Sequence, residues 1–183
     1  MVDSGIFVMV FVMALSIALI VGPIADRLGK RYKIISMMGG RRVNDVDARG
    51  VSKLGGLCLY LSFTITVLLA QLLPVPHLDP YENIRLIGLL VGGTVIFVVG
   101  LLDDIYQFRA LSIFTGQSIA AGIAIAFQIF IEFFNNPITG QQTVPWAYIV
   151  TVTLSYFWLV GMMNTVNFLD GLDGLAGGVA FIA

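Results

Sequence analysis

Residues 146–173 read WAYIVTVTLSYFWLVGMMNTVNFLDGLD, an apolar run that ends in a cluster of polar side chains. The run from 146 to 166 is long enough to cross the roughly 30 Å hydrocarbon core of a bilayer as one helix. A carboxylate near a bilayer is costly unless it faces a polar cavity, another protein group or a cation. The stretch therefore predicts a membrane span with a functional site at one end. The cluster comprises Asn164, Asn167, Asp170 and Asp173.

The composition of the whole chain is that of an integral membrane protein. Of its 183 residues, 58% are hydrophobic and only 11% are charged, whereas soluble domains carry about 25% charged residues. The mean hydropathy is +0.94. The single cysteine, Cys58, excludes an intrachain disulfide and a cysteine-rich metal site.

Five apolar runs are long enough, or nearly so, to span a bilayer as helices. A sixth begins at Leu175 and contains only nine residues up to Ala183. The sequence therefore predicts an all-α, polytopic transmembrane helix bundle with five complete spans and the start of a sixth. We expect residues 1–183 to form a single membrane domain, the N-terminal part of a larger, truncated protein. The five complete runs are 4–24, 54–73, 86–102, 111–132 and 146–166.

The basic residues predict how these spans are oriented. Eight of the ten lie between Arg27 and Lys53, and short loops rich in Lys and Arg stay on the cytoplasmic side. The N-terminus is then outside, and the Asn164–Asp173 cluster emerges on the cytoplasmic face. A second acidic pair, Asp103-Asp104, ends the third run on that same face.

The spacing of the 164–173 cluster predicts a break in the helix. Side chains three apart are neighbours on a helix, but each step of three falls about 60° short of a full revolution. One straight helix therefore cannot aim all four side chains inward. Gly171 and Gly174 permit a tight turn. We expect the helix to end or unwind near Gly171, with Asp170 and Asp173 on a loop above a cavity.

Acids at a span end often mark only the water interface, and Asp103-Asp104 alone would not indicate a site. Four acids on one membrane face with few basic residues nearby in the sequence favour a hard cation instead. Magnesium prefers carboxylate oxygens and is commonly completed by substrate phosphates. We therefore predict that Asp103, Asp104, Asp170 and Asp173 surround one shared cavity. The basic residues between Arg27 and Lys53 could meet those phosphates or serve topology alone.

Two sequence blocks resemble the signatures of a known enzyme family. Gly100-Leu-Leu-Asp-Asp104, followed by Gln117, is the first, and Asn164-x-x-Asn-Phe-Leu-Asp-Gly-Leu-Asp-Gly-Leu-Ala-Gly-Gly178 is the second. They are similar to those of the polyprenyl-phosphate N-acetylhexosamine-1-phosphate transferases of glycosyltransferase family 4, and Lys53-Leu-Gly-Gly56 also fits. The resemblance implies a magnesium-dependent membrane enzyme that transfers a sugar 1-phosphate, in particular N-acetylglucosamine 1-phosphate, from a UDP-N-acetylhexosamine to undecaprenyl or a related polyprenyl phosphate. UMP is released in this first membrane step of cell-envelope glycan synthesis.

The resemblance also implies roles for individual residues. Asp103 would accept a proton from the attacking lipid phosphate or orient it, with Asp104 beside it in the catalytic and metal region. Asp104 and Asp170 are the expected ligands of Mg²⁺, with Mn²⁺ as an alternative. Asn167, Asp170, Asp173 and Lys53 are expected to bind substrate. The expected location is the inner (plasma) membrane, with the active face cytoplasmic, no nucleic-acid partner, and a homodimer left open.

Departures from the family pattern and other classes of protein leave alternatives. The family's Pro-x-Pro-Arg-x-Gly-Gly element is replaced here by Gly50-Val-Ser-Lys-Leu-Gly-Gly56, and the lysine usual before Gln117 is absent. Its Gly-Asp-x-Gly metal block would lie beyond Ala183, so we expect this stretch to be inactive alone. The alternatives are a phospho-N-acetylmuramoyl-pentapeptide transferase of peptidoglycan synthesis and a noncatalytic membrane transport or scaffold protein.

Overall fold

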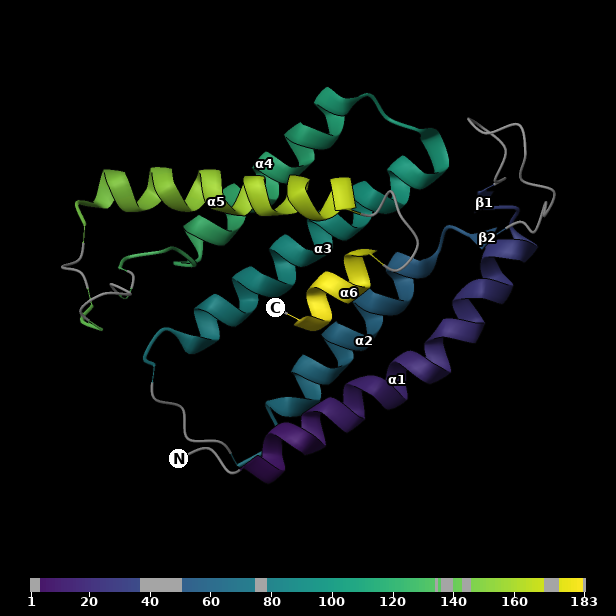
Figure 1. Cartoon of the computed structure of the whole chain (residues 1–183), viewed down its shortest axis with the longest axis horizontal. Helices are drawn as coiled ribbons and strands as arrows, with labels where there is room; N and C mark the ends of the chain where they lie inside the picture. Colours follow the sequence, from purple (N-terminus) through teal and green to yellow (C-terminus); the bar gives the residue numbers. More distant parts are fainter. Residues whose placement is uncertain are drawn as a thin grey trace. The chain divides into compact units, whose positions relative to one another are not determined.

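The computed structural model describes residues 4–36, 51–74, 79–133, 135, 140–142, 146–169 and 175–182. Helices dominate this part of the chain, as the sequence predicts (Figure 1). They are α1 (Ser4–Arg31), α2 (Gly55–Ala70), α3 (Glu82–Tyr106), α4 (Ala110–Ala126), α5 (Tyr148–Leu169) and the short α6 (Leu175–Ile182). The prediction of an all-α membrane helix bundle is confirmed.

Three of the helices are long and apolar enough to cross a membrane, namely α1, α3 and α5. The other two predicted spans form shorter apolar helices, α2 with 16 residues and α4 with 17. At 1.5 Å per residue these are about 24–26 Å long. Large apolar side chains remain exposed on all of the helices, for example Phe7, Leu59 and Phe157. Such surfaces suit a lipid environment.

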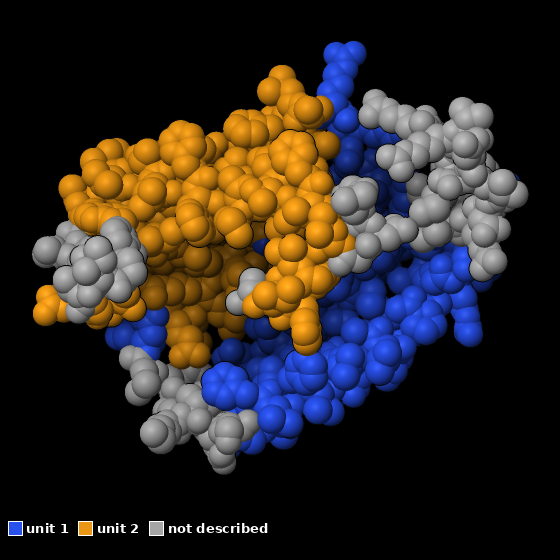
Figure 2. Space-filling model, in the orientation of Figure 1, with its two compact units in different colours: residues 1–80, 93–109 blue, residues 81–92, 110–183 orange. Residues whose placement is uncertain are grey.

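The chain divides into two compact units (Figure 2). Unit 1 comprises residues 1–80 and 93–109, and unit 2 comprises residues 81–92 and 110–183. Helix α3 contributes its first part to unit 2 and its last part to unit 1. The division concerns contacts within the chain, and the single membrane domain stays a prediction.

In unit 1, α1 and α2 pack side by side and run in opposite directions (Figure 1). The thiol of Cys58 on α2 donates a hydrogen bond to the carbonyl oxygen of Ala18 on α1 at 3.4 Å. Tyr60 stacks on Phe97 of α3 with 4.2 Å between ring centroids, and its hydroxyl lies 2.7 Å from that of Thr94. These contacts join three helices through small and aromatic side chains.

A short antiparallel pair of strands occupies part of the predicted basic loop. Strands β1 (Ile35–Ser36) and β2 (Val51–Ser52) pair with Ile35 opposite Ser52. Helix α1 also extends to Arg31, seven residues beyond the predicted end of the first span at residue 24. The extension ends in Lys30 and Arg31, whose positive charges are favourable at a helix C-terminus.

In unit 2, α4 and α5 pack together through small and polar side chains. The side chains of Gln117, Ala120 and Ala121 on α4 are buried, as are those of Thr151 and Ser155 on α5. Small residues let helices approach closely where lipid provides no hydrophobic driving force. This interface holds the polar contacts described below.

Helix α4 ends at Ala126, six residues before the predicted end at residue 132. Gln128 has a φ of +62°, and the N–H groups of Gln128 and Ile129 donate to the carbonyls of Ile125 and Ala124. This is a Schellman ending, with glutamine where glycine is usual. The apolar residues after it continue as non-helical chain, so the predicted boundary was wrong.

Candidate functional site

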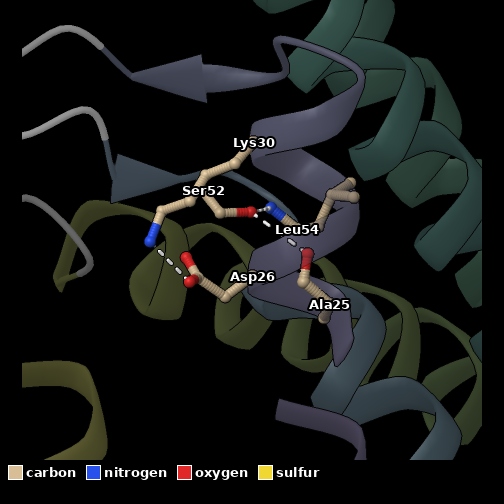
Figure 3. A network of polar contacts seen from close by, with 5 residues as sticks. All are labelled: Ala25, Asp26, Lys30, Ser52 and Leu54. Atoms are coloured by element: carbon tan, nitrogen blue, oxygen red, sulfur yellow. Dashed lines mark hydrogen bonds and ion pairs between the residues drawn. The ribbon is translucent and has the colours of Figure 1, made fainter. Parts of the chain in front are cut away.

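Ser52 and Leu54, the residues on either side of Lys53, are joined to each other and to α1 by hydrogen bonds (Figure 3). The Ser52 hydroxyl accepts the N–H of Leu54 at 3.2 Å and donates to the carbonyl of Ala25 on α1 at 3.5 Å. The N–H of Lys53 itself donates to the carbonyl of Ile34 at 3.1 Å. The backbone on either side of Lys53 is therefore attached to the C-terminal end of α1.

Gly29 makes this attachment sterically possible. A Cβ placed on Gly29 would collide with both the hydroxyl oxygen and the Cβ of Ser52. The close approach of α1 to β2 therefore requires glycine at this position. The nearby ion pair between Lys30 and Asp26, at 2.6 Å, is largely exposed and contributes little.

The two predicted catalytic acids, Asp103 and Asp104, lie in the last turn of α3 and are half-buried. Helix C-termini carry partial negative charge, so acids there are unfavourable, typically by about 0.3–1 kcal/mol each. The last turn of α3 contains no basic residue. This placement does not serve helix stability, and it is consistent with a functional requirement for the two carboxylates.

The Asp103 carboxylate has a defined orientation. Its Oδ1 accepts the N–H of Phe108 at 2.7 Å, while its backbone carbonyl accepts the N–H of Gln107 at 2.7 Å. Gln107 adopts a φ of +52°, the left-handed conformation of a helix C′ residue. The side chain of Asp103 thus binds the backbone that follows its own helix, which leaves its second oxygen and its charge for chemistry.

Lys53 and Asp104, predicted separately from two motifs, are brought together. The Lys53 ammonium donates a hydrogen bond to the backbone carbonyl oxygen of Asp104 at 3.3 Å. A cation at the C-terminal carbonyls of a helix interacts favourably with the helix dipole. Lys53 therefore supplies to α3 the positive charge that its last turn lacks, and it joins two predicted site residues 51 positions apart in the sequence.

The carboxamides of the second block lie in the last part of α5. Asn164 is half-buried, whereas Asn167 is exposed. The Nδ2 of Asn164 donates to Oε1 of Gln117 on α4 at 2.8 Å and to the carbonyl of Val160 at 2.9 Å. Gln117 is only 3% exposed. The second block is thereby joined to the glutamine that follows the first.

The other acids of the second block, Asp170 and Asp173, lie outside the described residues. Helix α5 is described to Leu169, and the predicted break near Gly171 lies outside the described residues as well. Within the described ranges, no group of three or more His, Cys, Asp or Glu side chains could hold a metal ion. The cavity shared by four carboxylates therefore stays a prediction.

The described residues can perform two kinds of chemistry at the end of α3. Two carboxylates can accept protons or bind a hard cation, and the ammonium of Lys53 can attract an anionic group. Sequence reasoning missed Ser52 and Gly29, which place Lys53. Neither has a local signature, because their contact joins residues 23 positions apart across a loop.

Comparison with known proteins places these motifs in context. The chain is 31% identical over 177 residues to a Bacillus subtilis protein named as a probable undecaprenyl-phosphate N-acetylglucosaminyl 1-phosphate transferase, covering 96% of this chain and 45% of that one. It is 32% identical over 141 residues to the decaprenyl-phosphate N-acetylglucosaminephosphotransferase of Mycolicibacterium smegmatis, covering 77% of this chain and 35% of the relative.

A phospho-N-acetylmuramoyl-pentapeptide-transferase from Lactobacillus gasseri is also similar, at 32% identity over 142 residues, covering 73% of this chain and 43% of the relative. The chain thus spans less than half the length of these relatives. No solved structure matches it. The profile described as glycosyl transferase family 4 matches residues 86–183, more than half of the chain and both acidic blocks. The chain therefore belongs to glycosyl transferase family 4.

Proposed function

We propose that the protein containing this chain transfers N-acetylglucosamine 1-phosphate from UDP-N-acetylglucosamine to undecaprenyl or a related polyprenyl phosphate and releases UMP. Family membership supports a phosphotransferase. The names of the Bacillus and Mycolicibacterium relatives support the sugar and the lipid. The observation that carries the proposal is the cluster of Lys53, Asp103 and Asp104 at the end of α3.

The transfer joins two anions, so the protein must neutralise and align them. An oxygen of the lipid phosphate attacks the β-phosphorus of the donor, and the bond to the bridging oxygen breaks as UMP leaves with the electron pair. Asp103 orients the attacking phosphate or accepts its proton, and the hydrogen bond it accepts from Phe108 fixes the direction of the carboxylate. Lys53 attracts the donor diphosphate, and Asn167 and Asp173 contact the nucleotide-sugar.

Magnesium is the proposed cofactor, with manganese as the alternative. Mg²⁺ is usually held by one or two carboxylates together with substrate phosphates, so the carboxylate of Asp104 is a fitting ligand and Asp170 is the proposed second one. When bound, the ion would neutralise charge on the diphosphate. The protein is proposed to lie in the plasma membrane with this site on the cytoplasmic face, and a homodimer is the proposed assembly. The basic residues between Arg27 and Lys53 support the orientation.

The test uses the complete gene product that contains this chain, purified in detergent with undecaprenyl phosphate. UDP-N-acetylglucosamine should yield UMP and one lipid-linked product with the mass of the added sugar phosphate, and EDTA should abolish both. UDP-N-acetylmuramoyl-pentapeptide is the competing donor, favoured by similarity to the Lactobacillus relative. Turnover of that donor alone would assign the protein to the peptidoglycan branch of the family. If neither donor is turned over, the proposal is refuted.

A further inference from the structure

A pair of carboxamides joins α4 to α5 within unit 2. The Nδ2 of Asn164 lies 2.8 Å from Oε1 of Gln117 and 2.9 Å from the carbonyl oxygen of Val160. Gln117 is 3% exposed, and Asn164 is half-buried. A buried amide costs about 1–3 kcal/mol if it is left unpaired, so this pair imposes a strict geometric demand on both helices.

One backbone group fixes the orientation of both amides. The carbonyl of Val160 can only accept hydrogen bonds, so the Asn164 atom beside it must be the donor, Nδ2. The Gln117 atom facing that nitrogen must in turn be the acceptor, Oε1. The usual ambiguity between oxygen and nitrogen in carboxamides is therefore resolved by the contacts themselves.

This orientation determines what the Asn164 side chain can offer to a ligand. An NH₂ group has two protons, and both are used, one toward Gln117 and one toward Val160. The remaining function is the carbonyl oxygen, Oδ1, which accepts hydrogen bonds or binds a cation. Asn164 is thus unsuited to donate to a phosphate oxygen.

We propose that Gln117 is a positioning residue that holds Asn164 as an oxygen acceptor for the nucleotide-sugar side of the reaction. The proposal rests on the proposed function and adds a residue and a chemical class of contact to it. The Oδ1 of Asn164 then binds an electron-pair acceptor. This acceptor is either an N–H or O–H of the nucleotide-sugar or the divalent cation that accompanies it. The lipid phosphate, which offers mainly acceptor oxygens, is excluded as its partner.

The experiment compares variants of the complete gene product that remove one inter-helix hydrogen bond each. Gln117→Met keeps the volume and removes the acceptor, so Asn164 loses one of its two fixed partners. Tyr156→Phe is the matched control, because the Tyr156 hydroxyl donates to Ser118 between the same two helices, also at 2.8 Å. Gln117→Glu retains an oxygen acceptor facing Asn164 and tests rescue.

We expect Gln117→Met to raise KM for UDP-N-acetylglucosamine about tenfold, the loss of roughly one hydrogen bond, with KM for polyprenyl phosphate unchanged. Gln117→Glu should restore most of that affinity, and Tyr156→Phe should leave both constants near their starting values. A higher magnesium requirement at saturating donor would identify the cation as the group received, and an unchanged requirement would identify the nucleotide-sugar. Equal losses in Gln117→Met and Tyr156→Phe, or a rise in KM for the lipid, would overturn the proposal.

Thermal unfolding separates this proposal from the proposed function. If Gln117 and Asn164 act as a pair, Gln117→Met/Asn164→Leu should lower Tm by less than the sum of the two single changes. Additive shifts would refute the pair whether or not the enzyme is active. Absence of turnover in the unaltered protein, with non-additive Tm shifts, would refute the transferase and leave the pair supported.

Discussion

The polar groups at the end of α3 and those between α4 and α5 are satisfied in opposite ways. Lys53 and Asp103 are ionisable, half-buried, and bonded to backbone groups near a helix end. Gln117 and Asn164 are neutral, and their contact is between side chains inside a helix pair. Burying a charge costs far more than burying a paired amide. In these two clusters the charged groups lie near a helix end, whereas the neutral amides lie between two helices.

The largest expected effect comes from Asp103→Asn in the complete gene product. The amide oxygen can still accept the N–H of Phe108, so this hydrogen bond remains while the charge is lost. Turnover should fall by about 10²–10⁴-fold, as for loss of a group that moves or orients a proton, with membrane insertion unchanged.

Measured rates of UMP release and the amount of protein in the membrane check this prediction. Asp79→Asn, in a predicted outer loop, is the control and should be nearly silent. If Asp103→Asn retained normal activity, the carboxylates at the end of α3 would mark only the water interface. Their difference from the neutral Gln117–Asn164 pair would then be unrelated to catalysis.

Gly29→Ala should disturb the site at the end of α3 indirectly, by displacing the backbone that holds Lys53. The new methyl group would collide with Ser52, and such overpacking typically costs about 1–3 kcal/mol. We expect a lower Tm together with reduced activity, because Ser52 holds the chain on both sides of Lys53. Gly88→Ala, which would meet Phe127 in unit 2, should lower Tm by a similar amount.

Gly93→Ala is the neutral control for both glycine substitutions. Apart from its chain neighbours and the nearby backbone of its own helix, no described atom lies within 4 Å of its Cβ position, and alanine favours a helix by about 1 kcal/mol over glycine. A fall in Tm for Gly93→Ala as large as that for Gly29→Ala would show that the Ser52 contact is not the cause.

Ser52→Ala isolates the hydrogen bonds of the same attachment. Its two bonds are long, at 3.2 and 3.5 Å, so we expect a loss of only about 0.5–1 kcal/mol in the free energy of unfolding. Ser16→Ala removes a bond from an exposed hydroxyl to Val12 within α1 and should change stability less. Chemical denaturation of both variants in detergent ranks them, and the reverse order would contradict the assignment.

The smallest effect is expected for Asp26→Asn. The Asp26 and Lys30 side chains are 45% and 57% exposed, and an exposed pair four residues apart on a helix is worth about 0.3–0.5 kcal/mol. The shift in Tm should be close to the error of measurement and should vanish at high salt. A large shift would show that the exposed ion pair at the end of α1 contributes more to stability than its exposure predicts.

The helices could be predicted from the sequence because apolar runs of membrane length leave few alternatives, but their ends could not. Helix α1 continues to Arg31 through charged residues that solvent and the helix dipole both tolerate. Helix α4 ends at Ala126 although residues 123–132 contain no glycine or proline, and the N–H of Ile131 donates to Ser155 on α5 at 2.7 Å. A contact 24 residues away has no local signature.

Part of the candidate site could be predicted from the sequence, because its residues belong to recognisable motifs. Lys53 and Asp104 are recognised from motifs, but the hydrogen bond between them was not predicted. The hydrogen bonds of Asp103 to Phe108 and of Ser52 to Leu54 could not be predicted, because each depends on the path of the chain outside the helices. The grouping of Asp103 with Asp170 stays a prediction.

The polar contacts between α4 and α5 also specify which turns of the two helices face each other. Leucine and phenylalanine surfaces in lipid can slide past one another with little change in energy. Gln117 on α4 meets Asn164 on α5, and Ser118 on α4 meets Tyr156 on α5. Sliding one helix by a single turn, about 5.4 Å, would separate both pairs at once. These hydrogen bonds therefore favour a single alignment of α4 against α5 during assembly in the membrane, before any substrate is bound.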